Sequence, residues 1–302
     1  MRIVSLLPSA SEIVARLGLL DQLVGVSHEC DHPAEVQGRP VLTSSILAHG
    51  LSPAEIDAAV AEASLERRPL YAVDGELLAS LKPDLIVTQG VCSVCAVTPE
   101  TVSSSLSFAR LESACAAPVL SLSGIDYAGI CADIRAVAEA CGAPERAEAL
   151  VAEMDARWRA IPALPGPAPR VLMLEWPGPP WSAGHWVPEQ VAAAGGLSLL
   201  SDAGGKSRRL TWEEIAEADP DLLVGAACGY DLDTNLKHLA EGIRTNPHLQ
   251  QLRAVKTGQV WAADANGFFS RPAPRVVDGA ELLAAIFSGG PVDASRAKRL
   301  QL

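Results

Sequence analysis

The fold is indicated most clearly by the stretch Lys82-Pro83-Asp84-Leu85-Ile86-Val87. Its proline ends the preceding helical pattern, and the apolar run that follows has the length and composition of a buried strand. The stretch Asp219-Pro220-Asp221-Leu222-Leu223-Val224 repeats this order in the second half of the chain. Two copies of the same helix-proline-strand junction predict two lobes built on one plan.

Strand and helix patterns alternate on both sides of each junction. In the first half we expect strands at 2–7, 23–27, 85–89 and 118–122, and helices at 10–18, 53–63, 75–81 and 99–114. In the second half we expect strands at 170–175, 222–224 and 258–263, and helices at 188–196, 211–218 and 274–287. Short strands separated by helices are typical of parallel sheets built from βαβ units.

The two halves are joined by a long helical pattern that runs from about 127 to 161. Gly142-Ala143-Pro144 either interrupts it, or Cys141-Gly142-Ala143 ends one helix and Pro144 begins another. Four prolines then follow within 162–169, which is typical of a stiff spacer. We therefore predict an N-terminal lobe at 1–122, a linking helix at 123–162 and a C-terminal lobe at 163–302. The fold class is α/β, with two Rossmann-like lobes, each with a central, mostly parallel sheet flanked by helices, joined by one long α-helix.

The composition limits the function and the location. The chain has 302 residues, 49% of them hydrophobic, and a net charge of −12. This charge argues against nucleic-acid and anionic-membrane surfaces, which need clustered Lys and Arg. The chain shows neither an apolar run of ~20 residues nor a secretory leader. Seven cysteines, an odd number, do not suggest a disulfide scaffold. We expect a monomer in the cytoplasm, or in the periplasm or at the cell surface if a leader had been removed.

Ligands of open parallel sheets bind beyond the carboxyl ends of the strands. In two facing lobes, both sets of loops would border one cleft between the lobes. The loops concerned are 8–11, 28–32, 90–97, 176–186, 227–230 and 264–271.

Ordered motifs along nearly the whole chain resemble one family. They are Leu7-Pro8-Ser9-Ala10-Ser11-Glu12, Val24-Gly25-Val26-Ser27 with Asp31-His32-Pro33, Leu81-Lys82-Pro83-Asp84-Leu85-Ile86, Pro179-Pro180-Trp181-Ser182-Ala183-Gly184, Gly195-Gly196, and Phe268 to Arg275. In this order they resemble the helix-linked substrate-binding proteins of ABC importers for cobalamin, haem and iron-siderophores, with the cobalamin-binding members nearest. Two features depart from that pattern: an insertion at 64–76 and a Cys-x-x-Cys at Cys92 and Cys95.

The resemblance implies a binding protein that has no catalytic activity and requires no cofactor. A corrinoid is the first choice of ligand, and haem or a siderophore is the alternative. An ABC permease is implied as a partner, docked through a carboxylate on each lobe, for which Asp57, Glu62, Glu213 and Glu214 are available.

Aromatic residues make up only 4% of the chain, yet they gather in the predicted ligand loops. Flat apolar side chains suit a large planar ligand, although ordinary loop packing would also place them there. Arg271 could pair with a ligand carboxylate, amide or phosphate, or close the last helix by a salt bridge. His28 or His185 could bind the metal of a corrinoid or haem. The expected ligand-binding residues are Pro8, Ser9, His28, Trp176, Trp181, His185, Trp186, Tyr230, Phe268, Phe269 and Arg271.

Cysteines supply a second hypothesis. Cys30, Cys92 and Cys95 follow strands of one predicted sheet and, with His28, could form a zinc or iron-sulfur site. Cys92 and Cys95 could instead form a redox pair or a disulfide, or remain thiols without metal. The alternative function is therefore a cytosolic metal- or redox-active protein on the same fold. A third hypothesis is that the chain is an interaction module with a vestigial cleft.

Catalytic motifs are absent from the sequence. We find no nucleophile elbow, phosphate-binding loop, dinucleotide fingerprint or zinc-protease motif. Glu12, Asp74 and Glu175 are scattered carboxylates without the second positioned partner that acid-base catalysis needs. We therefore predict that the chain is not an enzyme.

Overall fold

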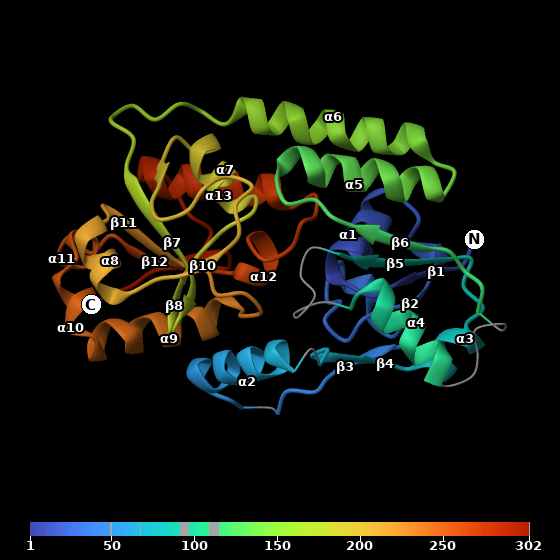
Figure 1. Cartoon of the computed structure of the whole chain (residues 1–302). Helices are drawn as coiled ribbons and strands as arrows, with labels where there is room; N and C mark the ends of the chain where they lie inside the picture. The colour runs from blue at the N-terminus through green and yellow to red at the C-terminus, as the bar shows by residue number, and fades with distance from the viewer. Residues whose placement is uncertain (49, 67, 91–96, 109–114, 302) are drawn as a thin grey trace. The chain divides into compact units, whose positions relative to one another are not determined.

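The structure is a computed structural model that describes residues 1–48, 50–66, 68–90, 97–108 and 115–301 (Figure 1). The described chain divides into two units, of which the first contains Met1–Gly124 and Ala128–Glu153, and the second contains Ile125–Tyr127 and Met154–Leu302. We call them the N-lobe and the C-lobe.

The N-lobe is built on a four-stranded sheet with the order β2-β1-β5-β6, in which every neighbouring pair is parallel. Its strands are β1 (Ile3–Ser5), β2 (Leu23–Gly25), β5 (Leu85–Gln89) and β6 (Val119–Leu122). All four lie where the apolar runs predict them.

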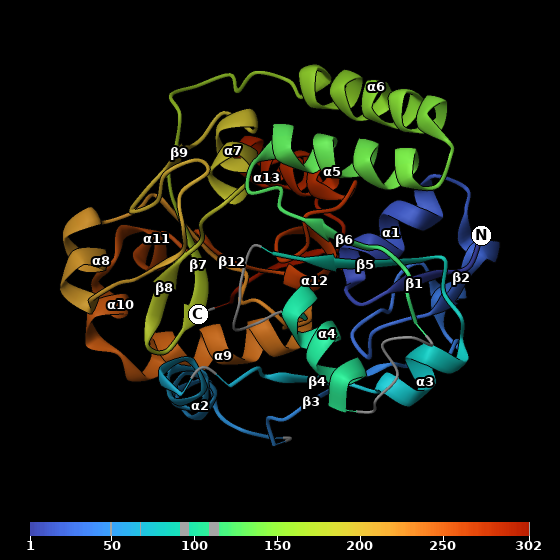
Figure 2. The same cartoon turned by 45° about the vertical axis from the view of Figure 1, so that its right-hand side comes forward.

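Helices cover both faces of this sheet. In Figures 1 and 2, α1 (Pro8–Arg16) and α5 (Tyr127–Ala140) lie over one face, and α3 (Gly75–Ser80) and α4 (Pro99–Phe108) over the other. Because strand side chains alternate between faces, Val4 and Leu6 share a face and join Ile86 in one buried cluster. This cluster includes Leu78 of α3 and Val102 of α4.

An antiparallel ribbon distinguishes the N-lobe. Strands β3 (Thr43–Ser45) and β4 (Tyr71–Val73) pair with each other, and α2 (Pro53–Leu65) lies between them in the sequence. The predicted insertion at 64–76 thus supplies β4 and the start of α3. Two short 3₁₀ helices complete the lobe, η1 (Leu20–Gln22) and η2 (Ala34–Val36).

The linking segment consists of two helices, so the single long helix of the predicted fold class is corrected. Helix α5 ends at Ala140 and α6 (Pro144–Ala160) begins four residues later. The break occurs at Gly142, whose φ of +67° is a left-handed conformation that glycine adopts without a Cβ clash. Of the two alternatives left open by the sequence, the structure has the one in which Pro144 begins a new helix.

The C-lobe sheet has a parallel centre and antiparallel edges. Its order is β10-β8-β7-β11-β12-β13, and β9 also pairs with β7. Strands β7, β11 and β12 are parallel, whereas β8, β10 and β13 run antiparallel to their neighbours. The strands are β7 (Arg170–Pro177), β8 (Pro180–Ser182), β9 (Leu197–Ser198), β10 (Arg208–Arg209), β11 (Leu222–Gly225), β12 (Val260–Ala263) and β13 (Ala297–Arg299).

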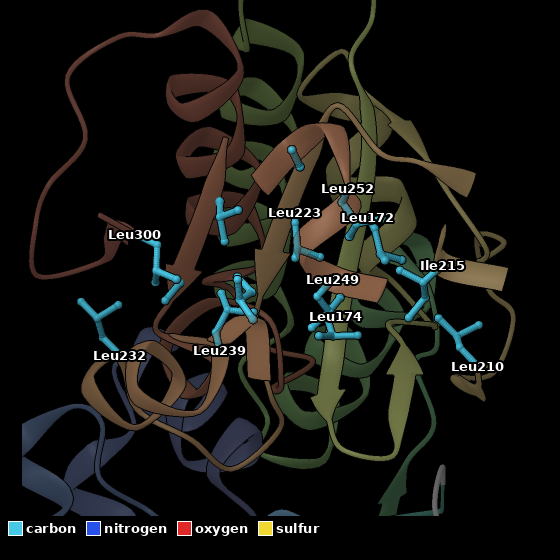
Figure 3. Packing of buried hydrophobic residues seen from close by; sticks show 14 residues of the cluster. Leu172, Leu174, Leu210, Ile215, Leu223, Leu232, Leu239, Leu249, Leu252 and Leu300 are labelled. Carbon is cyan, nitrogen blue, oxygen red and sulfur yellow. The ribbon is translucent and has the colours of Figure 1, made fainter. Parts of the chain in front are cut away.

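Helices also cover both faces of the C-lobe sheet. Figures 1 and 2 show α7 (Val187–Ala193) and α13 (Val276–Ser288) on one face, and α9 (Leu232–Thr245) and α10 (Pro247–Gln251) on the other. The remaining helices are α8 (Trp212–Ala218), α11 (Arg253–Lys256) and α12 (Ala265–Phe268). Figure 3 shows the buried cluster to which β7 contributes Leu172 and Leu174 and α9 contributes Leu239.

No helix in the described ranges is both long enough and apolar enough to cross a membrane.

Candidate functional site

The carboxyl ends of β7, β11 and β12 lie at one edge of the C-lobe sheet, because these three strands are parallel neighbours. Three of the predicted ligand loops leave the sheet at this edge: 176–186, 227–230 and 264–271. The sheet therefore brings together loops that are far apart in the sequence.

Aromatic rings form a connected row in these loops. The Trp176 and Tyr230 ring centroids are 5.1 Å apart, and those of Tyr230 and His238 are 5.3 Å apart. Trp181 lies opposite Trp176 in the β7–β8 hairpin. We call Trp176, Trp181, Tyr230 and His238 the aromatic row. The four residues are partly exposed, and burial raises the pKa of the Tyr230 phenol, which therefore stays protonated at neutral pH.

A buried amide on α9 holds the loop that carries Tyr230. Asn235 is only 3% exposed, and its Oδ1 accepts a hydrogen bond of 2.8 Å from the Ala227 backbone N–H. Its Nδ2 donates to the carbonyl oxygens of Ala263 (3.1 Å) and Tyr230 (3.3 Å). One side chain thus ties the loop after β11 to the end of β12. Neither Asn235 nor His238 was predicted from the sequence, where their only signal is their place in the helix that follows β11.

A second buried amide holds the loop at 264–271. Gln190 of α7 is fully buried, and its Nε2 donates to the carbonyl oxygens of Phe268 (3.0 Å) and Val276 (2.8 Å). Phe268 and Phe269 are also buried, and Arg296 lies 5.2 Å from the centroid of the Phe268 ring. The two phenylalanines therefore help to pack this loop, whereas Arg271 remains partly exposed.

Glu175 lies near the end of β7, where the register of β7 against β8 shifts between Leu174 and Trp176. Its Oε2 accepts hydrogen bonds from the Ser207 hydroxyl (2.7 Å) and from the Gly184 backbone N–H (3.4 Å). Burial raises the pKa of this carboxyl, and these two hydrogen bonds offset part of that effect. In the sequence Glu175 is a scattered carboxylate, whereas in the structure it has two positioned donors.

Two loops are joined beside Glu175. The His185 N–H donates to the Gly205 carbonyl (2.6 Å), and the Gly204 N–H donates to the His185 carbonyl (2.9 Å). Gly184 has no room for a side chain, since a Cβ there would lie 2.3 Å from the Ser207 nitrogen. This close approach explains the glycine that ends the Pro-Pro-Trp motif.

His185 is partly exposed in this loop pair, and its neighbour Trp186 is buried. Burial, with a smaller contribution from the charge of Lys206, lowers the pKa of the His185 imidazole, which is therefore neutral at neutral pH. Trp186 is only 6% exposed and its Nε1 has no hydrogen-bond partner in the described part of the chain. It is packed at the start of α7, not in the aromatic row.

Hydroxyl groups, instead of aromatic rings, occupy the carboxyl end of β1 in the N-lobe. Ser11 Oγ donates to Ser5 Oγ (2.9 Å) and lies 3.1 Å from Cys30 Sγ. Pro8 is the first residue of α1, and the adjacent Ser9 is 1% exposed with no partner for its hydroxyl among the described residues.

His28 follows β2 and is held by the antiparallel ribbon. Its ring nitrogen Nδ1 lies 2.6 Å from Thr43 Oγ1, and the Thr43 hydroxyl donates to Ser27 Oγ at 3.0 Å. Because the Thr43 proton is used there, Nδ1 is the donor, and the neutral ring has its lone pair on Nε2. Tyr71 of β4 lies beside His28, with ring centroids 5.5 Å apart. The ribbon thus orients an exposed imidazole.

The described residues do not support the predicted metal site. Within 1–48, 50–66, 68–90, 97–108 and 115–301, no group of three His, Cys, Asp or Glu side chains could hold a metal ion. Cys92 and Cys95 lie outside the described residues, so the proposed set with Cys30 and His28 is not seen.

Comparison of the sequence with known proteins finds one matching family and relatives named as cobalamin- or vitamin B12-binding proteins. The sequence profile described as "Periplasmic binding protein" matches residues 3–266. A "Cobalamin-binding protein" of Halobacterium salinarum is 25% identical over 283 residues, which is 92% of this chain and 66% of the relative. The chain thus spans slightly less than two thirds of that relative. A "Vitamin B12-binding protein" of Vibrio cholerae is 26% identical over 98 residues, or 32% of each chain.

Solved structures share the fold. A periplasmic haem-binding protein of Pseudomonas aeruginosa superposes with a TM-score of 0.70 at 22% identity, over 95% of this chain and 92% of the other. The periplasmic vitamin B12-binding protein of Vibrio cholerae has a TM-score of 0.58 at 20% identity, over 94% and 95%. At these identities the likeness concerns the fold, which confirms the predicted two-lobed α/β class.

Proposed function

We propose that this chain, which belongs to the periplasmic binding protein family, binds a corrinoid through the strand-end loops of its C-lobe. It is a substrate-binding protein and not an enzyme. The observation that carries the choice of ligand is the aromatic row, which places Trp176 and Tyr230 in ring contact at the carboxyl edge of the sheet. The arrangement of the ligand between two lobes stays a prediction from the sequence.

Ring contacts suit a corrinoid for a physical reason. A corrin macrocycle is a broad, mostly apolar face, and aromatic side chains bind such a face by area burial and stacking. The aromatic row is partly exposed, and hydrogen bonds from Asn235 fix the loop that carries Tyr230. This loop therefore loses little conformational freedom when a ligand binds. The relative that covers 92% of this chain is named as a cobalamin-binding protein, which favours a corrinoid over haem or a siderophore.

The two histidines are our candidates for contact with the metal of the ligand. An imidazole binds a metal through a nitrogen lone pair and so must be neutral. His185 meets this condition because burial lowers its pKa, and His28 presents Nε2 because Nδ1 is engaged with Thr43. Arg271, from the third loop, is proposed as a polar contact at the ligand edge.

Titration with a ligand panel tests this function. We expect cobinamide to bind with micromolar or tighter affinity in calorimetry and to change its visible spectrum, and haem and a ferric siderophore to bind more weakly. Trp176→Ala should weaken cobinamide binding by about tenfold or more, because stacking area is lost, whereas Trp176→Phe should keep most of the affinity. Absence of binding to every member of the panel would contradict the proposal.

We also propose delivery of the ligand to an ABC permease through one acid on each lobe. Glu213 is the better candidate on the C-lobe because its side chain is 75% exposed, whereas Glu214 caps α8 and pairs with Arg208 at 2.9 Å. Glu62 of α2 is exposed and Asp57 is partly exposed on the N-lobe. Delivery to a permease requires a location outside the inner membrane. The cytoplasmic location expected from the sequence is the alternative, and it would exclude this role.

Transport and location can be measured separately from ligand affinity. The double variant Glu62→Ala, Glu213→Ala should bind cobinamide normally and fail to stimulate the ATPase of the reconstituted importer. Normal stimulation by the variant would exclude these two acids, and recovery of the protein only in the cytosolic fraction of its host would exclude the delivery role.

A further inference from the structure

We propose that Glu175 selects the ligand by its edge groups, accepting a hydrogen bond from an amide of the bound molecule and disfavouring a carboxylate in the same place. The inference rests on the proposed function and extends it to specificity. It assigns a ligand-contacting role to a carboxyl group that lies beside the aromatic row.

The position of Glu175 is the first argument. It immediately precedes Trp176 in β7, at the carboxyl edge of the sheet where the three ligand loops begin. The register of β7 against β8 shifts between Leu174 and Trp176, which is at Glu175. The carboxyl lies with the loops at 184–185 and 204–207, because the Gly184 N–H and the Ser207 hydroxyl donate to it. The residue is partly exposed, which leaves the group within reach of a ligand at this edge.

The hydrogen bonds of Glu175 show which of its atoms remains available. Oε2 is occupied by two donors, the Ser207 hydroxyl and the Gly184 N–H. Oε1 has no hydrogen bond to any described residue. A donor on the ligand can therefore bind Oε1 without displacing a hydrogen bond within the described part of the protein.

Corrinoids offer such a donor. Their rim carries acetamide and propionamide side chains, which have N–H groups, whereas haem carries propionate groups, which are acceptors. Above the pKa that burial raises, where Glu175 is ionised, an acceptor that faces it would bring two negative groups together, which is unfavourable. The same site thus favours a neutral amide-bearing macrocycle over an anionic one.

The Glu175→Gln substitution should replace the acceptor that faces the ligand with a donor. The Gly184 N–H can only donate, so the introduced glutamine would turn its carbonyl oxygen toward Gly184 and Ser207. The amide NH₂ of the glutamine would then replace Oε1 and face the ligand. A primary amide on the ligand can rotate to accept from it, and a carboxylate, no longer repelled, gains a donor.

The test uses cyanocobalamin and its monocarboxylic acids, each with one propionamide converted to propionate. We expect the unaltered protein to bind at least one of the acids about tenfold more weakly than cobalamin. In Glu175→Gln that acid should bind within about threefold of cobalamin, while cobalamin itself keeps its affinity within about threefold. The ratio of the two affinities is the readout, because a general loss of folding or of loop order would lower both.

Two control variants accompany this comparison. Glu241→Gln removes one negative charge from the exposed side of α9 and should leave the ratio unchanged. Ser207→Ala removes one donor to Oε2 but keeps the charge of Glu175, and should preserve the discrimination.

The outcomes separate this inference from the proposed function. If the unaltered protein binds cobalamin and all of the acids with equal affinity, the role of Glu175 is overturned and the proposed function is not. That role is also overturned if an acid binds more tightly than cobalamin, which would make Lys206 the selecting group, or if Glu175→Gln leaves the ratio unchanged. Failure of the unaltered protein to bind cobalamin at all would overturn the proposed function, and the specificity inference with it.

Discussion

The strand-end loops of the two lobes have the same place in the fold but different chemistry. In the N-lobe they carry serine and threonine hydroxyls linked in series, with Ser11 bonded to Ser5 and Thr43 bonded to Ser27. In the C-lobe they carry aromatic rings anchored by two buried amides, Asn235 and Gln190. All six tryptophans of the chain lie in the C-lobe unit.

This difference shows that one sheet architecture can carry two kinds of chemistry in its strand-end loops. A hydroxyl-rich edge offers hydrogen bonds and little apolar area, whereas an aromatic edge offers area and shape. We infer that the C-lobe provides most of the binding energy for a planar ligand. Under the proposed function, we expect the N-lobe to contribute orientation, through groups such as the imidazole of His28.

The largest expected effect is a loss of stability when the anchoring of the C-lobe loops is removed. Asn235→Ala removes three hydrogen bonds, to Ala227, Tyr230 and Ala263, and leaves the buried N–H of Ala227 without its partner. We expect it to lower the free energy of unfolding of the C-lobe by about 2–4 kcal/mol. Urea unfolding followed by tryptophan fluorescence measures this directly, since the fluorescence comes from that lobe alone.

The matched N-lobe variant is Ser11→Ala, which removes one hydroxyl from a series of short contacts. We expect a cost of about 1 kcal/mol, measured by circular dichroism, because no backbone group is left unpaired. Equal costs for the two variants would mean that the loops of both lobes are anchored in the same way.

A pH-dependent effect of intermediate size should appear at Glu175. Burial raises the pKa of this carboxyl above its ordinary value of 4.5, so the folded protein disfavours the charged form more than the unfolded chain does. The stability of the protein should therefore decrease relative to Glu175→Gln as the pH rises from 4.5 through the raised pKa. Unfolding of both proteins over a pH series measures the difference, and a difference that stays constant or shrinks with rising pH would contradict the assignment.

The smallest effects are expected at the two histidines. His185→Ala should weaken cobinamide binding by about three- to tenfold, and His28→Ala by no more than about threefold, because single polar contacts at the rim of a site contribute little. Titrations monitored by the visible spectrum of the corrinoid measure both. A larger loss for His28→Ala would shift the main contribution to the N-lobe and reverse the comparison.

Much of the fold was predictable from local sequence. The junctions at Pro83 and Pro220 give a helix end and a buried strand within a few residues, and β5 and β11 begin where these junctions predict. The resemblance to importer binding proteins, drawn from the motifs in order, is confirmed by the family match over residues 3–266. The strands that were not predicted have only two or three residues each; they are β3, β4, β8, β9, β10 and β13. Except for β8, which forms a hairpin with β7, they pair with partners distant in the sequence.

The candidate site was predicted less completely, for a physical reason. The aromatic residues Trp176, Trp181 and Tyr230 stand out because they are rare and lie in loops after strands. The groups that hold them do not stand out, since Asn235 and Gln190 are ordinary polar residues of helices until tertiary structure buries them. Glu175 was passed over because its partner Ser207 lies 32 positions away. The residues predicted to bind ligand stay predictions until a ligand is bound.

Hydrogen-deuterium exchange with and without cobinamide tests the central claim most directly. The account predicts that saturating cobinamide protects the backbone at 174–186, 227–231 and 264–271 of the C-lobe more strongly than the N-lobe segments at 8–11 and 28–32. Protection confined to the N-lobe segments, or no change at the three C-lobe loops, would contradict the claim that the aromatic edge of the C-lobe holds the ligand.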